Sequence, residues 1–239
     1  MRKLLPILLC CLLPLAGRTA LGQTDLPHFG IALTASTLGA GIQAATAVTA
    51  HSNVRAGFNI FDYSHNFSKD GVNYEGELRL RSVQVTYDQF FGTFHISPGL
   101  LIYNGNKGSA TASVSNGQTF TLGGVTYYSS QTNPVTGSGT LTVNKAAPMI
   151  LFGFGNLLPR TQRHLGVNFE AGVVFEGTPK AKLNLTGAAC ITAQQVGCVS
   201  AATDPVVLTN VQSEQNKLND SIGPFKFYPV ISLGFSYKF

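Results

Sequence analysis

The C-terminal segment 231–239 alternates strictly between apolar and small or polar side chains. Its odd positions hold Ile231, Leu233, Phe235, Tyr237 and Phe239, whereas serine, glycine and lysine fill the even positions. Successive side chains of a β-strand point to opposite faces, so one face of this segment is wholly apolar and the other is not. This pattern is typical of a barrel wall that separates lipid from a polar interior.

Period-two alternation recurs upstream, and it predicts an all-β fold: an eight-stranded antiparallel up-and-down transmembrane β-barrel. An even strand number places both termini on the same side of the membrane. A soluble β-sandwich or a lipocalin-like cup also alternates, but its outer face would be charged, and charged residues make up only 11% of this chain. The other alternating segments lie at 29–36, 42–48, 54–60, 74–90, 93–103, 147–156 and 164–176.

One of these segments, 74–90, changes phase along its length. Its leucines at positions 78 and 80 belong to one phase, whereas the apolar residues at positions 83, 85 and 87 belong to the other. An extra residue in a strand would restore a single phase. A β-bulge near Arg81 or Ser82 is therefore expected.

The links between these segments alternate in length, as periplasmic turns and outer loops should. Links near 49–53, 90–92 and 158–163 are short, whereas 104–145 and 178–224 are expected to be two long outer loops. The short outer link at Leu38 departs from this trend. Within the long loops, 110–114 and 119–127 are expected to be extended, and 211–222 is expected to form a short helix.

The N-terminal residues have the features of a secretory signal peptide. Arg2 and Lys3 precede an apolar run from Leu4 to Leu15, and the segment ends in a small residue, Gly22. The run is too short to span a membrane. We therefore expect a cleaved signal peptide at 1–22, a single barrel domain at 23–239, and localisation in the outer membrane after passage through the periplasm. Lipidation at Cys10 or Cys11 is disfavoured because no small residue precedes either.

Removal of the signal peptide also lowers the formal charge. The full chain carries +5, but 13 basic residues then face 11 acidic ones, which leaves +2. This charge gives no reason to expect a nucleic acid partner.

Seven residues separate Cys190 from Cys198 in a polar loop of the mature chain. Because the periplasm is oxidising, a disulfide is expected. Closing this loop would stabilise the fold by about 2 to 3 kcal/mol in the chain-entropy account. A metal site is the alternative, but no histidine lies nearby and two thiolates form an incomplete ligand set.

The C-terminal alternation, with its terminal Phe239, resembles the assembly signal of bacterial outer-membrane β-barrel proteins. The resemblance implies that the barrel-assembly machinery reads Ile231, Leu233, Phe235, Tyr237 and Phe239. By size and strand number, the chain from residue 23 looks like the small eight-stranded barrels that include the OmpA membrane domain and OmpW. No peptidoglycan-binding domain follows, so a cell-wall tether is not expected. Residues 165–239 are also distantly similar to the end of small amino-acid porins, and this likeness assigns no ligand residue.

Polar residues on the inward faces form the main candidate constellation. An eight-stranded barrel is just wide enough to be filled by side chains, so inward charges should pair across the lumen. An arginine on the lipid face would cost about 2 to 4 kcal/mol at mid-membrane. The candidate luminal residues are Arg55, Glu77, Arg79, Arg81, Asp88, His95, His164 and Glu170.

Three functional classes follow from this pattern. The polar outer loops favour a structural or surface-interaction barrel. The luminal charges favour a narrow channel for small polar solutes. A lipid-modifying enzyme would need a nucleophile and a base, but the adjacent Ser64 and His65 point to opposite faces of a strand. We therefore expect no enzymatic activity, no cofactor and no metal, with outer-membrane lipid, the assembly machinery and a small polar solute as the candidate partners.

Overall fold

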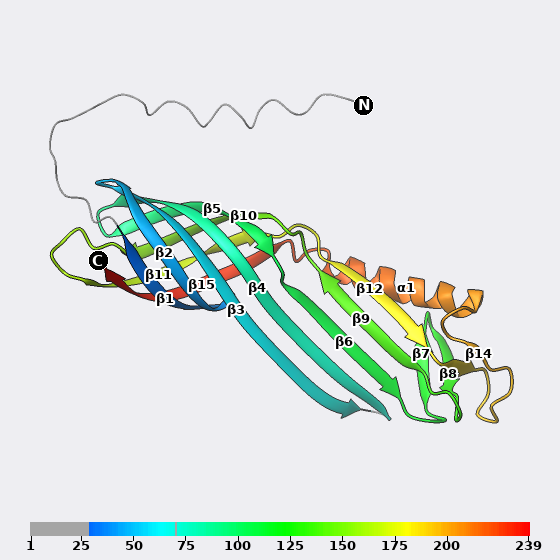
Figure 1. Ribbon diagram of the computed structural model, residues 1–239. Helices are drawn as coiled ribbons and strands as arrows, with labels where there is room; N and C mark the ends of the chain where they lie inside the picture. Colours follow the sequence, from blue (N-terminus) through cyan, green and yellow to red (C-terminus); the bar gives the residue numbers. More distant parts are fainter. Residues whose placement is uncertain (1–28, 70) are drawn as a thin grey trace, which may run out of the picture.

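The computed structural model describes residues 29–69 and 71–239 (Figure 1). Antiparallel strands run through most of this range, so the predicted all-β class is confirmed. The predicted signal peptide, 1–22, lies outside the described residues. Within the described ranges, no helix has the length and hydropathy needed to cross a membrane.

Eight strands pair as a continuous ring. Pairing passes from β4 through β3, β2, β1, β15, β11 and β10 to β5, and β5 pairs again with β4. In the ring, β1 lies between β2 and the last strand, β15. These strands are β1 (Gly30–Ser36), β2 (Gly39–Thr49), β3 (Ser52–Lys69), β4 (Val72–Phe91), β5 (Phe94–Asn104), β10 (Ala147–Gly155), β11 (Leu165–Phe175) and β15 (Phe227–Lys238).

Strands β3 and β4 continue beyond the ring and begin a second, projecting part of the same sheet, which we call the extension. It consists of β3 from Phe61, β4 up to Leu80, and the strands β6 (Lys107–Val114), β9 (Thr136–Thr142) and β12 (Lys180–Thr186). Figure 1 shows the extension at one end of the ring and the C-terminus at the other. The predicted extended piece at 110–114 is part of β6. The long outer links are therefore largely folded.

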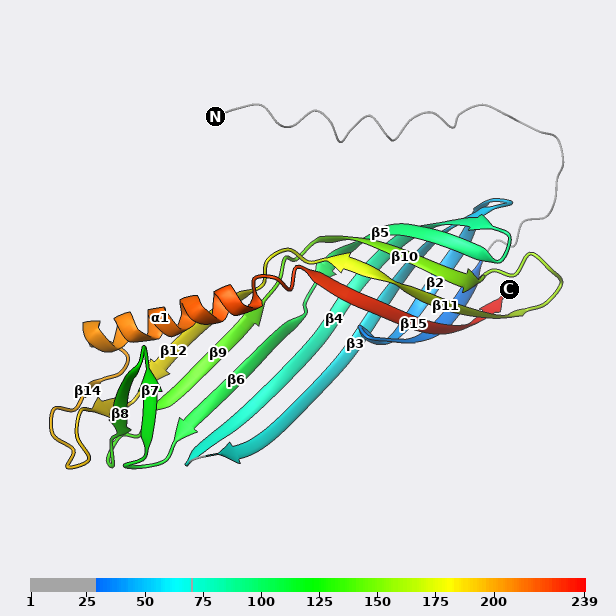
Figure 2. The same cartoon turned by 180° about the vertical axis from the view of Figure 1, so that it is seen from behind.

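One face of the extension is covered by a helix and a small second sheet (Figure 2). The helix α1 (Pro205–Ile222) begins earlier than the predicted 211–222, because Asp204 caps it by accepting hydrogen bonds from the backbone N–H groups of Val206 and Val207. The small sheet comprises β7 (Thr119–Leu122), β8 (Val125–Ser129), β13 (Ala188–Cys190) and β14 (Val199–Ser200).

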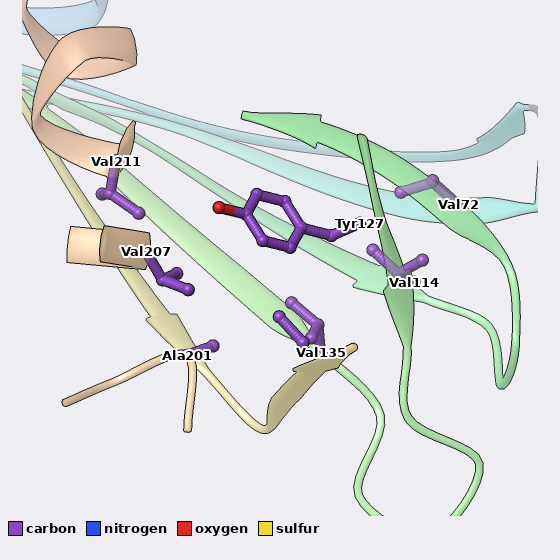
Figure 3. Packing of buried hydrophobic residues seen from close by; sticks show 8 residues of the cluster. Val72, Val114, Tyr127, Val135, Ala201, Val207 and Val211 are labelled. Atoms are coloured by element: carbon purple, nitrogen blue, oxygen red, sulfur yellow. The ribbon is translucent and has the colours of Figure 1, made fainter. Parts of the chain in front are cut away.

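A hydrophobic core joins these layers (Figure 3). Val72 and Val114 of the extension, Tyr127 of β8, and Val207 and Val211 of α1 are buried together. The Tyr127 hydroxyl, the polar end of this core, accepts a 2.7 Å hydrogen bond from the Asn210 side chain. The helix is thus fixed against the sheet by both apolar and polar contacts.

Two side chains of α1 also bind the outer edge of the extension. The Gln215 side-chain oxygen accepts from the Leu183 backbone N–H at 2.9 Å, and Asn219 accepts from the Ala181 N–H at 2.8 Å. The amide of Asn219 donates back to the Ala181 carbonyl. The edge of β12, which would otherwise present unpaired backbone groups, is thereby capped.

The two faces of the sheet exchange polarity where the ring ends. In the ring, Phe58 and Ile60 point outward and Asn59 is buried inside; beyond them Phe61 lies on the inner face and Asp62 on the outer. The register of β3 against β4 is continuous from Ser52–Gln89 to Lys69–Val72. The phase change seen in the sequence of 74–90 therefore reflects the step from the ring to the extension. The bulge expected near Arg81 or Ser82 is absent from this strand pair. A register shift does occur against β5, between Val83 and Gln84.

Candidate functional site

The centre of the ring holds a buried ion pair between opposite strands. Arg55 projects from β3 and Glu170 from β11, which lies four strands away around the ring. Two guanidinium nitrogens donate to the two carboxylate oxygens, at 2.9 and 2.5 Å. Both side chains are fully buried. The pair therefore spans the interior and ties opposite walls together.

Four further side chains complete the network around Arg55. Asp88 of β4 forms a second ion pair with it at 3.0 Å. Gln43 of β2 and Thr86 of β4 accept hydrogen bonds from it, each at 3.1 Å. His95 of β5 lies 3.0 Å from the Glu170 carboxylate. Five strands thus contribute to one cluster.

Such a network is costly to build and costly to break. Moving charges out of water carries a desolvation cost of several kcal/mol per ion, which only close pairing offsets. Here one guanidinium faces two carboxylates, and its donors also reach neutral oxygens. The arrangement fixes the diameter of the ring and fills its centre.

Apolar clusters lie at both ends of the interior. At the extension end, Leu38, which occupies the short turn between β1 and β2, packs with Leu101, Met149 and Leu151. At the end that holds the C-terminus, Leu157 and Leu158 of the β10–β11 link fold inward against small side chains of β1 and β2. The network of Arg55 lies between these two apolar clusters.

The link that carries Leu157 and Leu158 is held in place by polar contacts. One Arg160 nitrogen donates to the carbonyls of Thr49 and Ser52 and to the Asn53 side chain. The Lys238 amine donates to the carbonyls of Pro159 and Thr161. This predicted short link is therefore a folded plug.

Part of the interior is polar but unpaired. Among the described residues, buried side-chain oxygen or nitrogen atoms of Thr34, Ser97, Asn168, Ser232 and Ser236 have no hydrogen-bond partner. Thr34, Gly234 and Asn168 face one another in register across β1, β15 and β11. Buried polar atoms are normally satisfied by protein or water, so this belt is a hydrophilic zone.

The structure brings together only four of the eight predicted luminal residues: Arg55, Asp88, His95 and Glu170. Glu77 and Arg79 lie on the outer face of the extension, and Arg81 lies on the same outer face at the end of the ring. Arg79 pairs with Glu77, and both arginines pair with Asp62 of β3. Their side chains are partly exposed. Placing them in the lumen was wrong because all three share the outward face of β4 with Val83; Arg81 lies at the end of the ring, and Glu77 and Arg79 lie beyond it.

His164 was also wrongly placed in the lumen. It precedes β11 at the rim, is exposed, stacks on the Tyr237 ring, and contacts the Lys238 carbonyl through Nδ1 at 3.0 Å. Strand alternation does not extend to a residue outside the strand.

The residues of the predicted assembly signal share the outward face of β15. Their apolar side chains are exposed, as are Leu33 on β1, Val167 on β11 and Phe152 on β10. Within the ring, which includes β3 only up to Ile60 and β4 only from Ser82, the outward faces carry no charged side chain among the described residues. These residues are Ile231, Leu233, Phe235 and Tyr237 on β15, and Phe239 directly after it.

The inner face of the extension holds a second candidate site, which was not predicted from the sequence. A narrow strip of very small residues, which we call the lane, runs along β6 and β9 between longer side chains. Three hollows of about 290, 320 and 250 Å³ follow it from β7, beneath α1, to the start of β15, and neighbouring hollows share lining residues. The lane consists of Gly108, Ala110, Ala112, Gly137 and Gly139. The alternating small residues of the segments that form β6 and β9 could have indicated this site in the sequence.

Three other predictions concern local chemistry. Cys190 and Cys198 form the predicted disulfide. His65 stacks between Tyr63 and Phe67 on the inner face of β3, and alternation places Ser64 on the other face. No group of three or more His, Cys, Asp or Glu residues in the described part of the chain is arranged to hold a metal ion.

Comparison with known proteins gives a likeness of fold. No family model matches the sequence, and no curated protein matches it. The crystal structure of Acinetobacter baumannii CarO superposes with a TM-score of 0.53 at 20% identity, covering 88% of this chain and 97% of that one. The structure of CarO2 from the same organism gives 0.55 at 19% identity, with coverages of 90% and 100%.

Proposed function

We propose that the ring is an eight-stranded outer-membrane β-barrel whose sealed interior makes it a rigid anchor for a surface-exposed binding module, the extension. The C-terminal end would face the periplasm and the extension would face outward. In this arrangement, function resides mainly in the projecting part. The same topology fits an exported chain with short links on one side and long ones on the other.

The exchange of polarity at the end of the ring carries this proposal. Outward apolar side chains form a band that ends at Ile60 on β3. Arg81, which pairs with Ile60 in register, marks the same limit on β4, and Asp62 and Arg79 occupy the outer face beyond it. Lipid favours the first surface and water the second. A soluble sheet would have no reason to change its outer face in this way.

The closed interior supports an anchoring role. Arg55 and Glu170 join opposite walls, and apolar clusters fill both ends. An extension of five strands, covered by a helix and a small second sheet, is larger than a barrel needs for its own closure. Exposed, folded loops on a rigid scaffold are where binding sites usually lie.

Protease treatment of intact cells would test the orientation. A cleavage site inserted at Gly117, in the exposed turn between β6 and β7, should be cut from outside. A matched site inserted at Gly92, in the β4–β5 turn at the C-terminal end, should be cut only after the outer membrane is opened. The reverse pattern, or no heat-modifiable band in the outer-membrane fraction, would refute the proposal.

A narrow path for small polar solutes is the second candidate. The belt of unpaired polar atoms at Thr34, Asn168, Ser232 and Ser236 favours it, because a hydrophilic zone suits water and small solutes. This path would require movement of both the Leu157–Leu158 plug and the cluster around Leu38 at the extension end. Steady single-channel conductance in a planar bilayer, increased by replacing Leu158 with serine, would support it, whereas silence in both proteins would favour the sealed anchor.

A further inference from the structure

The lane has the shape and chemistry of a site for an unbranched apolar chain. In its middle hollow, every lining side chain is uncharged, and α1 contributes Leu218 and Ile222 as a wall. The backbone groups of the floor are used in pairing β6 with β9. A ligand lying there would find few free hydrogen-bonding groups, so it must be apolar along its length.

The width of the lane favours a chain over a bulky ring system. The side chains of the lane end at Cβ or are absent, whereas longer side chains stand on both flanks and Leu141 stands beside Gly108 towards the base. Tyr74 and Leu78 border it on β4, and Leu183 borders it on β12. A Cβ placed on Gly139 would already lie 3.2 Å from the Leu183 side chain, which shows how close that flank is.

The base of the lane opens next to the apolar band of the ring. The hollow at that end is lined by Phe225 and Phe227, which are 70% and 59% exposed, and its lining also includes the charged residues Lys107 and Glu176. Phe227 is the first residue in the outward apolar row of β15 and contacts Phe175 of β11. The aliphatic material nearest to this opening is the membrane itself.

We propose that the lane binds the acyl chain of a membrane lipid, which enters at Phe225 and Phe227 and lies along β6 and β9 beneath α1. The proposal rests on the proposed function, because it requires the ring to be in the membrane and the extension to project from it. It adds the ligand class and the route of entry. Binding would remove from water an apolar surface that is otherwise partly exposed.

Photo-crosslinking in lipid nanodiscs would test this. The mature chain is inserted into nanodiscs containing a phospholipid with a diazirine near the end of one acyl chain, and cross-linked peptides are mapped by mass spectrometry. Labelling of β6, β9 or α1, in addition to the outward faces of the ring, is the expected result. Labelling confined to the ring would overturn the proposal.

Matched variants give the control. Ala110→Phe places a ring in the lane and should abolish labelling of the extension, whereas Thr111→Phe adds the same ring on the outer face of β6 and should leave it unchanged. Equal labelling of the two variants would contradict the proposal. Leu218→Asp, on the partly exposed helix wall, provides a second test that does not alter the sheet, and heat-modifiable mobility verifies folding of each variant.

A second arm supplies a diazirine-labelled fatty acid from water to nanodiscs of unlabelled lipid. If the free fatty acid labels the lane and the membrane phospholipid does not, the proposal that the ligand comes from the membrane is wrong. The protease experiment on intact cells reports orientation independently, so failure of the proposed function and failure of this inference can be distinguished.

Discussion

Replacing Arg55 with methionine should severely destabilise the ring. The substitution keeps a long apolar side chain but leaves the carboxylates of Asp88 and Glu170 buried without their shared cation. Breaking a buried ion pair by removing one partner costs about 3 to 5 kcal/mol, and two carboxylates are affected here. We therefore expect a loss near the upper end of this range, which is a large share of the stability of an ordinary domain.

Arg79→Met is the matched control, because Arg79 also contacts two carboxylates but lies partly exposed on the extension. Its solvent-screened pairs should contribute little. The chain contains no tryptophan, so urea unfolding in detergent micelles is best followed by circular dichroism and by the heat-modifiable electrophoretic shift.

Neutralising the stranded acids should then restore stability. In the Arg55→Met background, Glu170→Gln removes one uncompensated charge, so this double variant should be more stable than Arg55→Met alone. The reasoning is refuted if Arg55→Met unfolds at the same urea concentration as Arg79→Met. It is also refuted if Glu170→Gln destabilises the wild-type protein and the Arg55→Met variant equally.

Three further predictions concern the plug, the outer ion cluster and the C-terminus. Leu158→Ala should lower the free energy of unfolding by about 2 to 5 kcal/mol, because Leu158 is fully buried in the plug; a urea midpoint equal to wild type would contradict its packing role. The hydrogen bond and charge of Arg79 hold the pKa of Glu77 below its ordinary range, so this ion pair is lost as the pH falls through that lowered pKa. Arg79→Met should therefore raise the pKa of Glu77 in a carboxyl-detected NMR titration. An unchanged pKa would refute this pairing. Phe239→Ser should reduce the folded protein in the outer membrane while leaving refolding in detergent nearly intact; equal membrane levels would count against the assembly signal.

Strand positions and outward faces could be predicted because every second side chain of a strand that faces lipid must be apolar. The same rule placed Arg55 and Glu170 inside, but not against each other. Their contact depends on ring closure between β3 and β11, which are 115 residues apart along the chain at these positions. Local alternation contains no information about such a distant partner.

The errors have a common physical cause. Alternation was extended through Arg81, Arg79 and Glu77 as though β4 stayed in the membrane, and the phase change was attributed to a bulge. The change of phase at Leu80 and Arg81 is itself the boundary between lipid and water.

The start of the helix was a separate error. Asp204 followed by Pro205 is a helix-start signal that would have extended the predicted helix to its true beginning.

The seam between β1 and β15 has a consequence for biogenesis. Gly30 pairs with Lys238, and the Phe239 N–H donates to the Phe29 carbonyl, so the first and last strands of the ring are neighbours. No N-terminal fragment can complete the ring while it is being synthesised, and its closing contacts have nearly the greatest sequence separation that the chain allows. Folding should therefore be slow and concerted, which leaves an open strand edge to be guarded in transit. The adjacent ends also make the ring suitable for circular permutation, with new termini in the β4–β5 turn.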